Sequence, residues 1–293
     1  PVYTFMAPSQ LHEFIKLLKE TDVDLSDKFA FQISTSKHFF DVTAHEYIKL
    51  NCLDMNLKYL GGLSLDMEDL TKKEGRTQIK SFYDLMMFKI ENNYYEKPII
   101  NKTKLKEYKT SLRTVKKKEG NETVIVTDLK EDDKSLKNMI DDFIKTYPYK
   151  VDVINLDEFK FKGGCIGCLN CAQSGKCIYN DNFDELLMRI FDYKAIVYAY
   201  SIKDHSMGHI FKTYDDRQFY NGHRTLTVGK PVGYIVNGDL NNEQNLKTMM
   251  IARADAGQNY LAGIATNSEG IKELANTLDY AINNNTLLPQ MFY

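Results

Sequence analysis

Short runs of apolar residues recur through the second half of the chain, and longer amphipathic stretches separate them. Alternating or β-branched runs predict five strands, namely ETVIVTD from Glu122, KVDVINL from Lys150, KAIVYAYS from Lys194, KPVGYIVNGD from Lys230 and NYLAGIATN from Asn259. Apolar spacings of three and four residues predict helices between them, as in DNFDELLMRIFDY. Strands that alternate with helices predict a parallel sheet with helices on both faces.

Five strands in this order fit the α/β class, as a flavodoxin-like doubly wound parallel five-stranded sheet. Sheets of this kind bind their ligands in the crevice outside the carboxyl ends of the strands. Candidate binding residues are therefore expected in the loops that follow the strands.

The first part of the chain repeats the last part of this pattern. KFAFQISTS from Lys28 aligns with KPVGYIVNG from Lys230, and Leu11 aligns with Phe211, an offset of about 200 residues. The first copy has no counterpart of ETVIVTD or KVDVINL, so either half of its fold is missing from this chain or something else completes it. The predicted organisation is a partial flavodoxin-like domain at residues 1–95, a charged linker at 96–120 and a complete domain at 121–293.

Composition and charge exclude several classes of partner. The chain has 43% hydrophobic residues, 27% charged residues and a formal net charge of −2, which gives no electrostatic reason to expect nucleic acid or a membrane surface as a partner. No apolar run approaches the length of a membrane span, and the first residues lack the pattern of a signal peptide. Cysteine is scarce outside one cluster, so we predict that the protein is located in the reducing environment of the cytoplasm. We also predict that Cys52 is a buried, structural residue.

Four of the five cysteines lie in one loop with the spacing C-x2-C-x2-C-x5-C. The candidate metal ligands are Cys165, Cys168, Cys171 and Cys177. Two consecutive two-residue gaps let three sulfurs face a common centre, as an iron–sulfur cluster requires, and the glycines of the loop allow the necessary turns. Zinc is the alternative, although structural zinc usually uses two separated C-x-x-C pairs. Metal-free thiols also remain open at this spacing.

These motifs carry a resemblance to a known family. CIGCLNC and GKCIYNDNFDELL, followed by AIVYAYS and IFKTYDDR, resemble the NADPH-dependent FMN reductase family and especially its iron–sulfur flavoprotein branch. The resemblance covers residues 121–293 and the start of the first copy, where Pro1, Val2 and Tyr3 match the end of the S-P-V-Y turn of the family. It implies FMN at the strand ends, a 4Fe-4S cluster beside it, NAD(P)H or a redox partner protein, and a homodimer.

The second copy departs from the family pattern in its phosphate loop. The loop reads TDLKEDDKSLKN and has no glycine. A phosphate is held by backbone N–H groups and hydroxyls at a helix N-terminus, whereas Asp128 and the carboxylates at 131–133 would repel it. The S-P-V-Y turn has become YSIK. A pair in which one unit holds the flavin and the other holds the cluster would account for both changes.

The candidate cofactor-binding residues lie at the strand ends of both copies. In the first copy they are Pro1, Val2, Tyr3, Ser34, Thr35 and Ser36. In the second copy they are Thr127, Ser135, Tyr200, Ser201, Ile202, Asn237, Gly238 and Asp239. The alternatives are hydroxyls that cap a helix beginning near Asp41 and a ligand-free turn after VNGD.

The sequence leaves two hypotheses from different classes. One is a cytoplasmic redox flavoprotein, an NAD(P)H- or ferredoxin-linked oxidoreductase that transfers electrons between FMN and an iron–sulfur cluster. The other is a non-catalytic metal-binding or electron-carrier module whose C-terminal domain has lost flavin. No hydrolase elbow, Walker A loop or G-x-G-x-x-G motif is present, and no catalytic residue is assigned.

Overall fold

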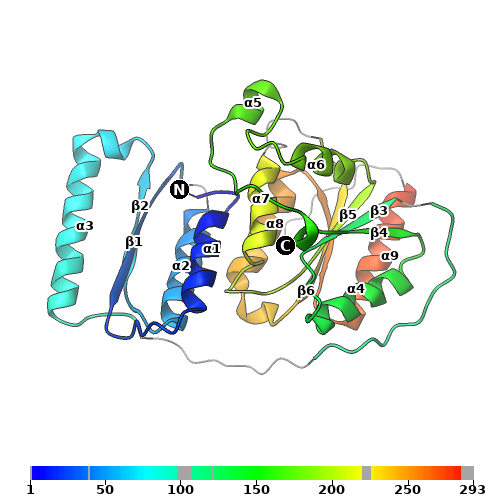
Figure 1. The fold of residues 1–293 in the computed structure, drawn as a ribbon, viewed down its shortest axis with the longest axis horizontal. Helices are drawn as coiled ribbons and strands as arrows, with labels where there is room; N and C mark the ends of the chain where they lie inside the picture. The colour runs from blue at the N-terminus through cyan, green and yellow to red at the C-terminus, as the bar shows by residue number, and fades with distance from the viewer. Residues whose placement is uncertain (1, 39, 98–106, 121, 220–225, 285–293) are drawn as a thin grey trace.

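The computed structural model describes residues 2–38, 40–97, 107–120, 122–219 and 226–284. We call residues 2–97 the first unit and residues 122–284 the second unit (Figure 1). The second unit contains a parallel sheet in the order β4-β3-β5-β6-β7. Its strands are β3 (Thr123–Thr127), β4 (Val151–Asn155), β5 (Ala195–Ser201), β6 (Pro231–Asn237) and β7 (Tyr260–Ala265). Counted within the unit, this is the order 2-1-3-4-5, so the predicted flavodoxin-like fold is confirmed.

Helices cover both faces of this sheet (Figure 1). One face packs against α4 (Lys134–Thr146) and α9 (Ser268–Asn284). The other packs against α6 (Phe183–Phe191), α7 (His209–Arg217) and α8 (Gln244–Ala256). The short helices are η2 (Leu156–Glu158), α5 (Asn170–Ser174) and η4 (Leu240–Asn242). Helix α4 shows why these residues form such a layer, because Leu136, Met139, Ile140 and Phe143 recur at helical spacing and are all buried against the sheet.

The first unit has two parallel strands and three α-helices. Its elements are α1 (Ser9–Lys19), β1 (Phe29–Ser36), α2 (Asp41–Asp54), β2 (Lys58–Asp66), η1 (Asp69–Thr71) and α3 (Lys73–Glu91). Helix α2 begins at Asp41, as expected, and Cys52 is buried on it. Between β2 and α3, which begins at Lys73, lies the short helix η1.

Strands β1 and β2 have the same register as β6 and β7. The equivalent pairs are Phe29–Lys58 with Pro231–Tyr260, and Ile33–Leu63 with Ile235–Ala265. The register is interrupted at the same place in both, after Ala30 and after Val232. This agreement favours the interpretation of a repeat, whereas the domain boundaries themselves stay a prediction.

Equivalent helices of the two units pack against each other. Helix α1 lies against α7, and α2 lies against α8, so the two units are related by an approximate two-fold arrangement (Figure 1). On the first-unit side, the ring of His12 on α1 stacks on that of Tyr47 on α2, with centroids 4.0 Å apart. The side-chain amide of Asn51 donates to the backbone carbonyl of Asp204 at 3.1 Å. The contact thus joins side chains and backbone of the two units.

The segment between the units is partly attached to the second unit. The buried carboxylate of Asp142 on α4 accepts hydrogen bonds from the Tyr108 hydroxyl and the Ser111 N–H, both at 2.9 Å. Lys117 donates to the last carbonyls of α4, including that of Tyr147 at 2.5 Å. Residues 107–120 therefore lie along α4, and most of them are exposed to solvent. None of the described helices combines the length and the apolar character needed to cross a bilayer.

His205 forms a charged bridge between the units. Its ring nitrogens lie 2.8 Å from a Glu243 carboxylate oxygen and 3.0 Å from an Asp54 carboxylate oxygen. Burial lowers the pKa of His205, but the hydrogen bonds to Asp54 and Glu243 outweigh burial and raise the pKa to about 9. Asp54 belongs to α2 of the first unit, so protonated His205 holds the units together.

Stability is expected to fall in alkaline solution because of this histidine. A raised folded-state pKa gives stabilisation that is complete below the unfolded-state pKa of about 6.5 and is lost as the pH rises through about 9. We expect His205→Gln to be less stable than the parent by about 2–3 kcal/mol at pH 6 and by much less at pH 10. Urea unfolding at both pH values measures this difference. A deficit that does not change with pH would contradict the assignment, and exposed His38→Gln is the control.

Candidate functional site

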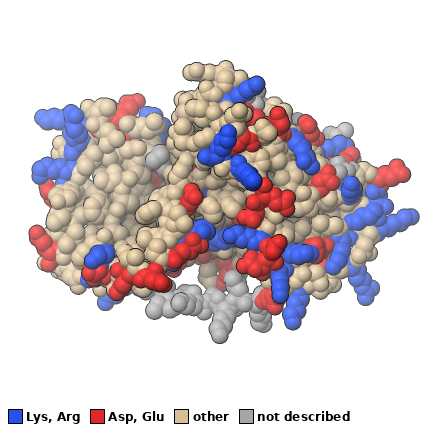
Figure 2. Space-filling model, in the orientation of Figure 1, with Lys and Arg blue, Asp and Glu red and all other residues tan. Residues whose placement is uncertain are grey.

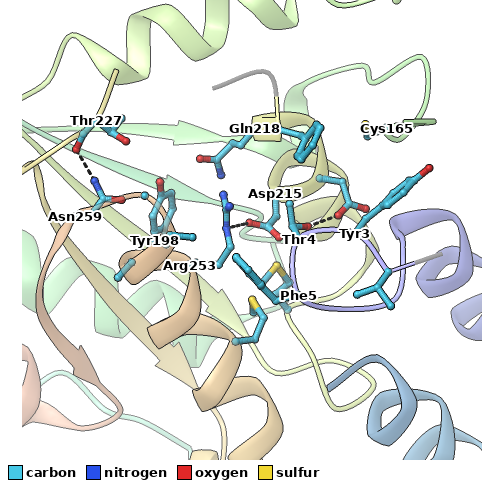
Figure 3. Close-up of a pocket in the computed structure, with 18 of the residues that line it drawn as sticks. Tyr3, Thr4, Phe5, Cys165, Tyr198, Asp215, Gln218, Thr227, Arg253 and Asn259 are labelled. Atoms are coloured by element: carbon cyan, nitrogen blue, oxygen red, sulfur yellow. Dashed lines mark hydrogen bonds and ion pairs between the residues drawn. The ribbon is translucent and has the colours of Figure 1, made fainter. Parts of the chain in front are cut away.

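A large cavity lined by described residues lies between the two units. Its volume is about 740 Å³. The first unit contributes the turn Val2–Phe5 and residues Thr35–Lys37, and the second unit contributes side chains of β5, β6, α7 and α8 (Figure 3). Cys165 and Gly167 of the cysteine loop also line it. The cavity therefore brings together predicted flavin-binding residues (Val2, Tyr3, Thr35 and Ser36) and one predicted metal ligand.

The turn at the start of the first unit has an unusual backbone. Tyr3 and Met6 exchange backbone hydrogen bonds of 2.8 and 3.0 Å, and Thr4 and Phe5 have positive φ values of 42° and 65°. Lys203 and Ser206 exchange the same pair of bonds in the second unit, around residues 204 and 205 with φ values of 51° and 61°. Non-glycine residues rarely adopt this conformation unless surrounding contacts enforce it.

A buried ion pair holds this turn against α7. Lys212 and Asp216 form the pair, and both side chains are 0% exposed. The Lys212 ammonium also donates to the Tyr3 carbonyl at 3.0 Å and to the Thr4 hydroxyl at 2.5 Å. The Asp216 carboxylate accepts from the Thr4 hydroxyl and from the Ser9 N–H, the latter at 2.7 Å. The conformation of the first-unit turn is thus fixed by charged groups of the second unit.

Next to this turn lies the cysteine loop of the second unit. The side-chain amide of Gln10 donates to the Cys165 carbonyl at 3.1 Å. Gly167 has a positive φ of 66°, and a β-carbon at this position would lie 2.5 Å from the Tyr3 hydroxyl oxygen. Both features favour glycine at this position. The cysteine loop and the first-unit turn therefore meet directly.

Three of the four cysteines are partly buried, and Cys168 is exposed. Burial raises the pKa of Cys165 and of Cys171, and the negative charges of neighbouring thiolates raise both further. The sulfurs of the loop are therefore near enough to influence one another. Among the described residues, however, no group of three or more Cys, His, Asp or Glu side chains is arranged to hold a metal ion. Four thiols are a donor set that suits iron–sulfur clusters or zinc, and the loop would have to close for all four to ligate.

Arg217 anchors the end of the cysteine loop. Its guanidinium donates to both carboxylate oxygens of Asp181, at 2.5 and 2.8 Å, and to the sulfur of Cys177 at 3.3 Å. The rings of Phe183 and Tyr179 lie 4.2 and 5.2 Å from its central carbon. Arg217 is the last residue of α7, so this ion pair joins that helix to the end of the cysteine loop. The pairing also gives a cation beside one thiol.

Other first-unit candidates have partners within their own unit. The Ser36 hydroxyl donates to Asp41, and the Ser34 hydroxyl lies 2.6 Å from the ring nitrogen of His45. Thr35 and Lys37 line the cavity, and Phe40 packs edge-to-face on Phe5 with centroids 4.9 Å apart. Pro1 lies outside the described residues.

The second-unit candidates gather at a different place, the carboxyl edge of the five-stranded sheet. There Asp128 is buried and pairs with Lys203 at 2.7 Å. The Ser201 hydroxyl donates to Asp133 and accepts from the Asn237 amide at 2.8 Å. Burial raises the pKa of Asp128 to about 6 despite its pairing with Lys203. Carboxylates therefore occupy the part of the loop where a phosphate would need hydrogen-bond donors.

The remaining second-unit candidates surround this edge. The Ser135 hydroxyl accepts from the Tyr108 N–H at 3.1 Å, so residues 107–120 approach the first turn of α4. Asn237 and Gly238 line a second cavity of about 390 Å³ together with Tyr108. Thr127, Tyr200, Ile202 and Asp239 lie at the same edge, and none of them lines the large cavity. The second-unit candidates are thus separated from the cavity that adjoins the cysteine loop.

Sequence reasoning missed the residues that form the inner part of the large cavity. Arg253 pairs with Asp215 at 2.7 Å, and the rings of Tyr198 and Tyr234 lie 5.4 Å apart (Figure 3). An arginine among the apolar residues of α8 was the available signal, because a cation on the apolar side of a helix requires a partner.

Part of the sequence is similar to that of a known protein. No protein-family profile matches the chain. Over a stretch of 88 residues, the chain is 30% identical to an iron–sulfur flavoprotein of Archaeoglobus fulgidus. This stretch makes up 30% of the chain. The chain spans only about 40% of the length of that curated relative.

Solved structures with low similarity include three bacterial proteins. A flavodoxin, WrbA-like protein from Agrobacterium tumefaciens is 14% identical, with a TM-score of 0.37 over 56% of this chain and 97% of its own. An oxidoreductase from Corynebacterium diphtheriae is 15% identical, with a TM-score of 0.41; the match covers 56% of this chain and 98% of the oxidoreductase. An FMN-dependent NADH-azoreductase from Bacillus anthracis, solved with FMN, is 12% identical, with a TM-score of 0.37; the match covers 57% of this chain and 100% of the azoreductase.

These TM-scores are low, so the fold assignment rests on the strand order of the second unit. The sequence match supports the predicted resemblance independently. The chain has a flavodoxin-like fold and resembles the iron–sulfur flavoproteins.

Proposed function

We propose that this protein is a flavin-dependent oxidoreductase in which the two units share one redox site. The flavin ring would lie in the large cavity, against the turn Val2–Phe5, and the four cysteines beside it would hold an iron–sulfur cluster. Zinc is the alternative metal. The observation that carries the proposal is the direct contact between the cysteine loop and the first unit, at Gly167 and Tyr3 of the turn and at Cys165 and Gln10 of α1. Both segments line the same cavity.

The residues present suit a flavin ring at this position. Phe5 and Met67 offer apolar surface, and Thr35 and Lys37 offer polar groups at the edge of the cavity. A mostly apolar cavity with a few polar groups is typical of cofactor sites. When bound, flavin supplies one- and two-electron chemistry, and the protein supplies its position and surroundings. The electron donor, which we propose to be NAD(P)H or a redox protein, and a homodimeric state remain predictions.

One observation favours the second candidate function, a metal-binding or electron-carrier module without flavin in its C-terminal domain. The ion pair between Asp128 and Lys203 and the hydrogen bonds of Asp133 fill the phosphate loop of the second unit. A phosphate loop that no longer binds phosphate can be filled by interactions among its own side chains in this way. This observation concerns only the second unit, so it is compatible with a flavin that is bound by the first unit.

Replacing Tyr3 with alanine tests the flavin position. If the ring contacts Tyr3, riboflavin affinity should fall by about tenfold, because loss of an aromatic contact costs about 1.4 kcal/mol. Titration followed by quenching of flavin fluorescence measures the dissociation constant. Tyr83→Ala, on the exposed part of α3, is the matched control and should bind as the parent does. Equal affinities of the Tyr3 variant and the parent would contradict the proposed position.

A further inference from the structure

The large cavity extends past the first-unit turn into the second unit. Its inner part is lined by Tyr198 of β5, Tyr234 of β6 and Arg253 of α8. Figure 3 shows Arg253 between Tyr198 and Phe5, so the inner part is continuous with the side of the cavity that the turn Val2–Phe5 forms. The whole cavity, at about 740 Å³, falls within the range of about 300–1,000 Å³ that is typical of small-molecule sites.

The walls of the inner part are apolar and aromatic. The rings of Tyr198 and Tyr234 lie 5.4 Å apart, and the buried side chains of Val232 and Met249 line the same space. Burial raises the pKa of Tyr198 to about 12, so this side chain is uncharged at pH 7. Walls of this kind suit the apolar body of a ligand, and aromatic rings pack favourably against other rings.

Arg253 places a cation where the inner part meets the first-unit turn. Its Nε lies 2.7 Å from a carboxylate oxygen of Asp215, and its central carbon lies 6.0 Å from the centre of the Phe5 ring. Among the described residues, neither terminal nitrogen of Arg253 has a hydrogen-bond partner, and the side chain is 22% exposed. The end of the guanidinium is therefore open to a ligand, and its two parallel N–H donors match the two oxygens of a carboxylate.

The surrounding charges favour a ligand with a single negative charge. Arg253 shares Asp215 with Lys212, which also pairs with Asp216, so positive and negative charges in this group are equal in number. Lys, Arg, Asp and Glu are also intermixed over the visible surface of the second unit (Figure 2). A polyphosphate would find no surplus of positive charge here. A single carboxylate, by contrast, gains charge-assisted hydrogen bonds from Arg253.

We propose that the inner part of the large cavity binds an aromatic monocarboxylate, with its carboxylate on the open end of Arg253 and its ring against Tyr198 and Tyr234. This site is separate from the flavin position, which we place against the turn Val2–Phe5. Because Arg253 lies beside Phe5, the bound acid would lie next to the flavin ring, a conclusion that rests on the proposed function.

Calorimetric titration of the intact chain with 2-naphthoate tests this site. The dissociation constant should be at least about tenfold lower than that of 2-naphthamide, which has the same rings and no charge, because a bidentate contact with a guanidinium is charge-assisted. The saturated acid decahydro-2-naphthoate keeps the charge and lacks aromatic rings. It should bind at least about threefold more weakly than 2-naphthoate.

Variants of Arg253 assign the preference for the acid to this side chain. Arg253→Met should bind the acid and the amide with dissociation constants within about twofold of each other. The double variant Arg253→Met with Asp215→Asn removes both members of the ion pair, leaves no unpaired carboxylate at position 215, and should show the same loss of preference. Arg189→Met, on the exposed side of α6, is the control and should keep the preference of the parent.

Three outcomes would overturn the assignment of a carboxylate site. They are no binding of 2-naphthoate to the parent, equal affinities for the acid and the amide, and an unchanged preference in the Arg253 variants. Binding of the saturated acid as tight as that of 2-naphthoate would refute the aromatic part. Riboflavin titration of the same sample separates this inference from the proposed function. Binding of riboflavin without 2-naphthoate would refute only the acid site, and the reverse would refute only the flavin proposal.

Discussion

Replacing Lys212 with methionine is expected to destabilise the protein by about 3–5 kcal/mol at pH 7. The substitution leaves the Asp216 carboxylate buried without its counter-ion, and breaking one partner of a buried ion pair has costs of this size. Lys212 also binds the Tyr3 carbonyl and the Thr4 hydroxyl, so the first-unit turn loses its attachment to α7. Urea unfolding measures the change in the free energy of unfolding.

The pH dependence of this loss identifies its cause. Burial raises the pKa of Asp216, which Lys212 opposes in the parent protein. Without Lys212 the carboxyl should protonate more readily in the folded state, so the deficit should shrink as the pH falls from 7 toward 5. Lys80→Met removes an exposed ion pair with Asp84 and should cost less than about 1 kcal/mol. A loss at Lys212 as small as the loss at Lys80 would refute the buried-pair account.

The second large effect is expected at Arg217. Arg217→Lys keeps the charge but cannot donate to both oxygens of Asp181 while also reaching Cys177. We expect bound metal to be lost to a chelator at least about tenfold faster than from the parent, which corresponds to about 1.4 kcal/mol. Arg217→Met should lose metal faster still and should unfold at lower urea concentration, because Asp181 is then buried without its counter-ion.

Metal release is followed by absorption of the chelator complex after anaerobic mixing. Arg189→Lys, on the exposed side of α6, is the matched control and should release metal as the parent does. Unchanged release from both Arg217 variants would show that the contact with Cys177 does not position the loop.

Much of the fold could be predicted because it depends on local patterns. The strands of the second unit are short apolar runs, and their alternation with helices restricts the connections to a parallel sheet. The repeat was visible because Lys28 and Lys230 begin equivalent strands. The cysteines and the first-unit turn could be named as candidates, but nothing local indicated that they meet in one cavity. That contact depends on the packing of α1 against α7.

Other features depend on partners far apart in the sequence and could not be predicted. Lys212 and Asp216 form one side of a helix that would be exposed in an isolated domain, and they are buried because the first unit covers them. Asp142 attracts the segment from Tyr108 onward through hydrogen bonds that no local pattern reveals. The charged composition of residues 96–120 pointed to solvent, and most of residues 107–120 are exposed, but it gave no sign of the attachment to α4.

The central claim is that the cysteine loop and the first-unit turn form one redox site. The measurement that tests it most directly is a visible absorption spectrum of anaerobically purified protein, with iron, sulfide, zinc and released flavin assayed on the same sample. The account predicts broad absorption near about 400 nm, iron and sulfide in equal amounts, and flavin released on denaturation. Zinc with a featureless spectrum and no flavin would contradict it and leave a metal-binding module on a flavodoxin-like fold.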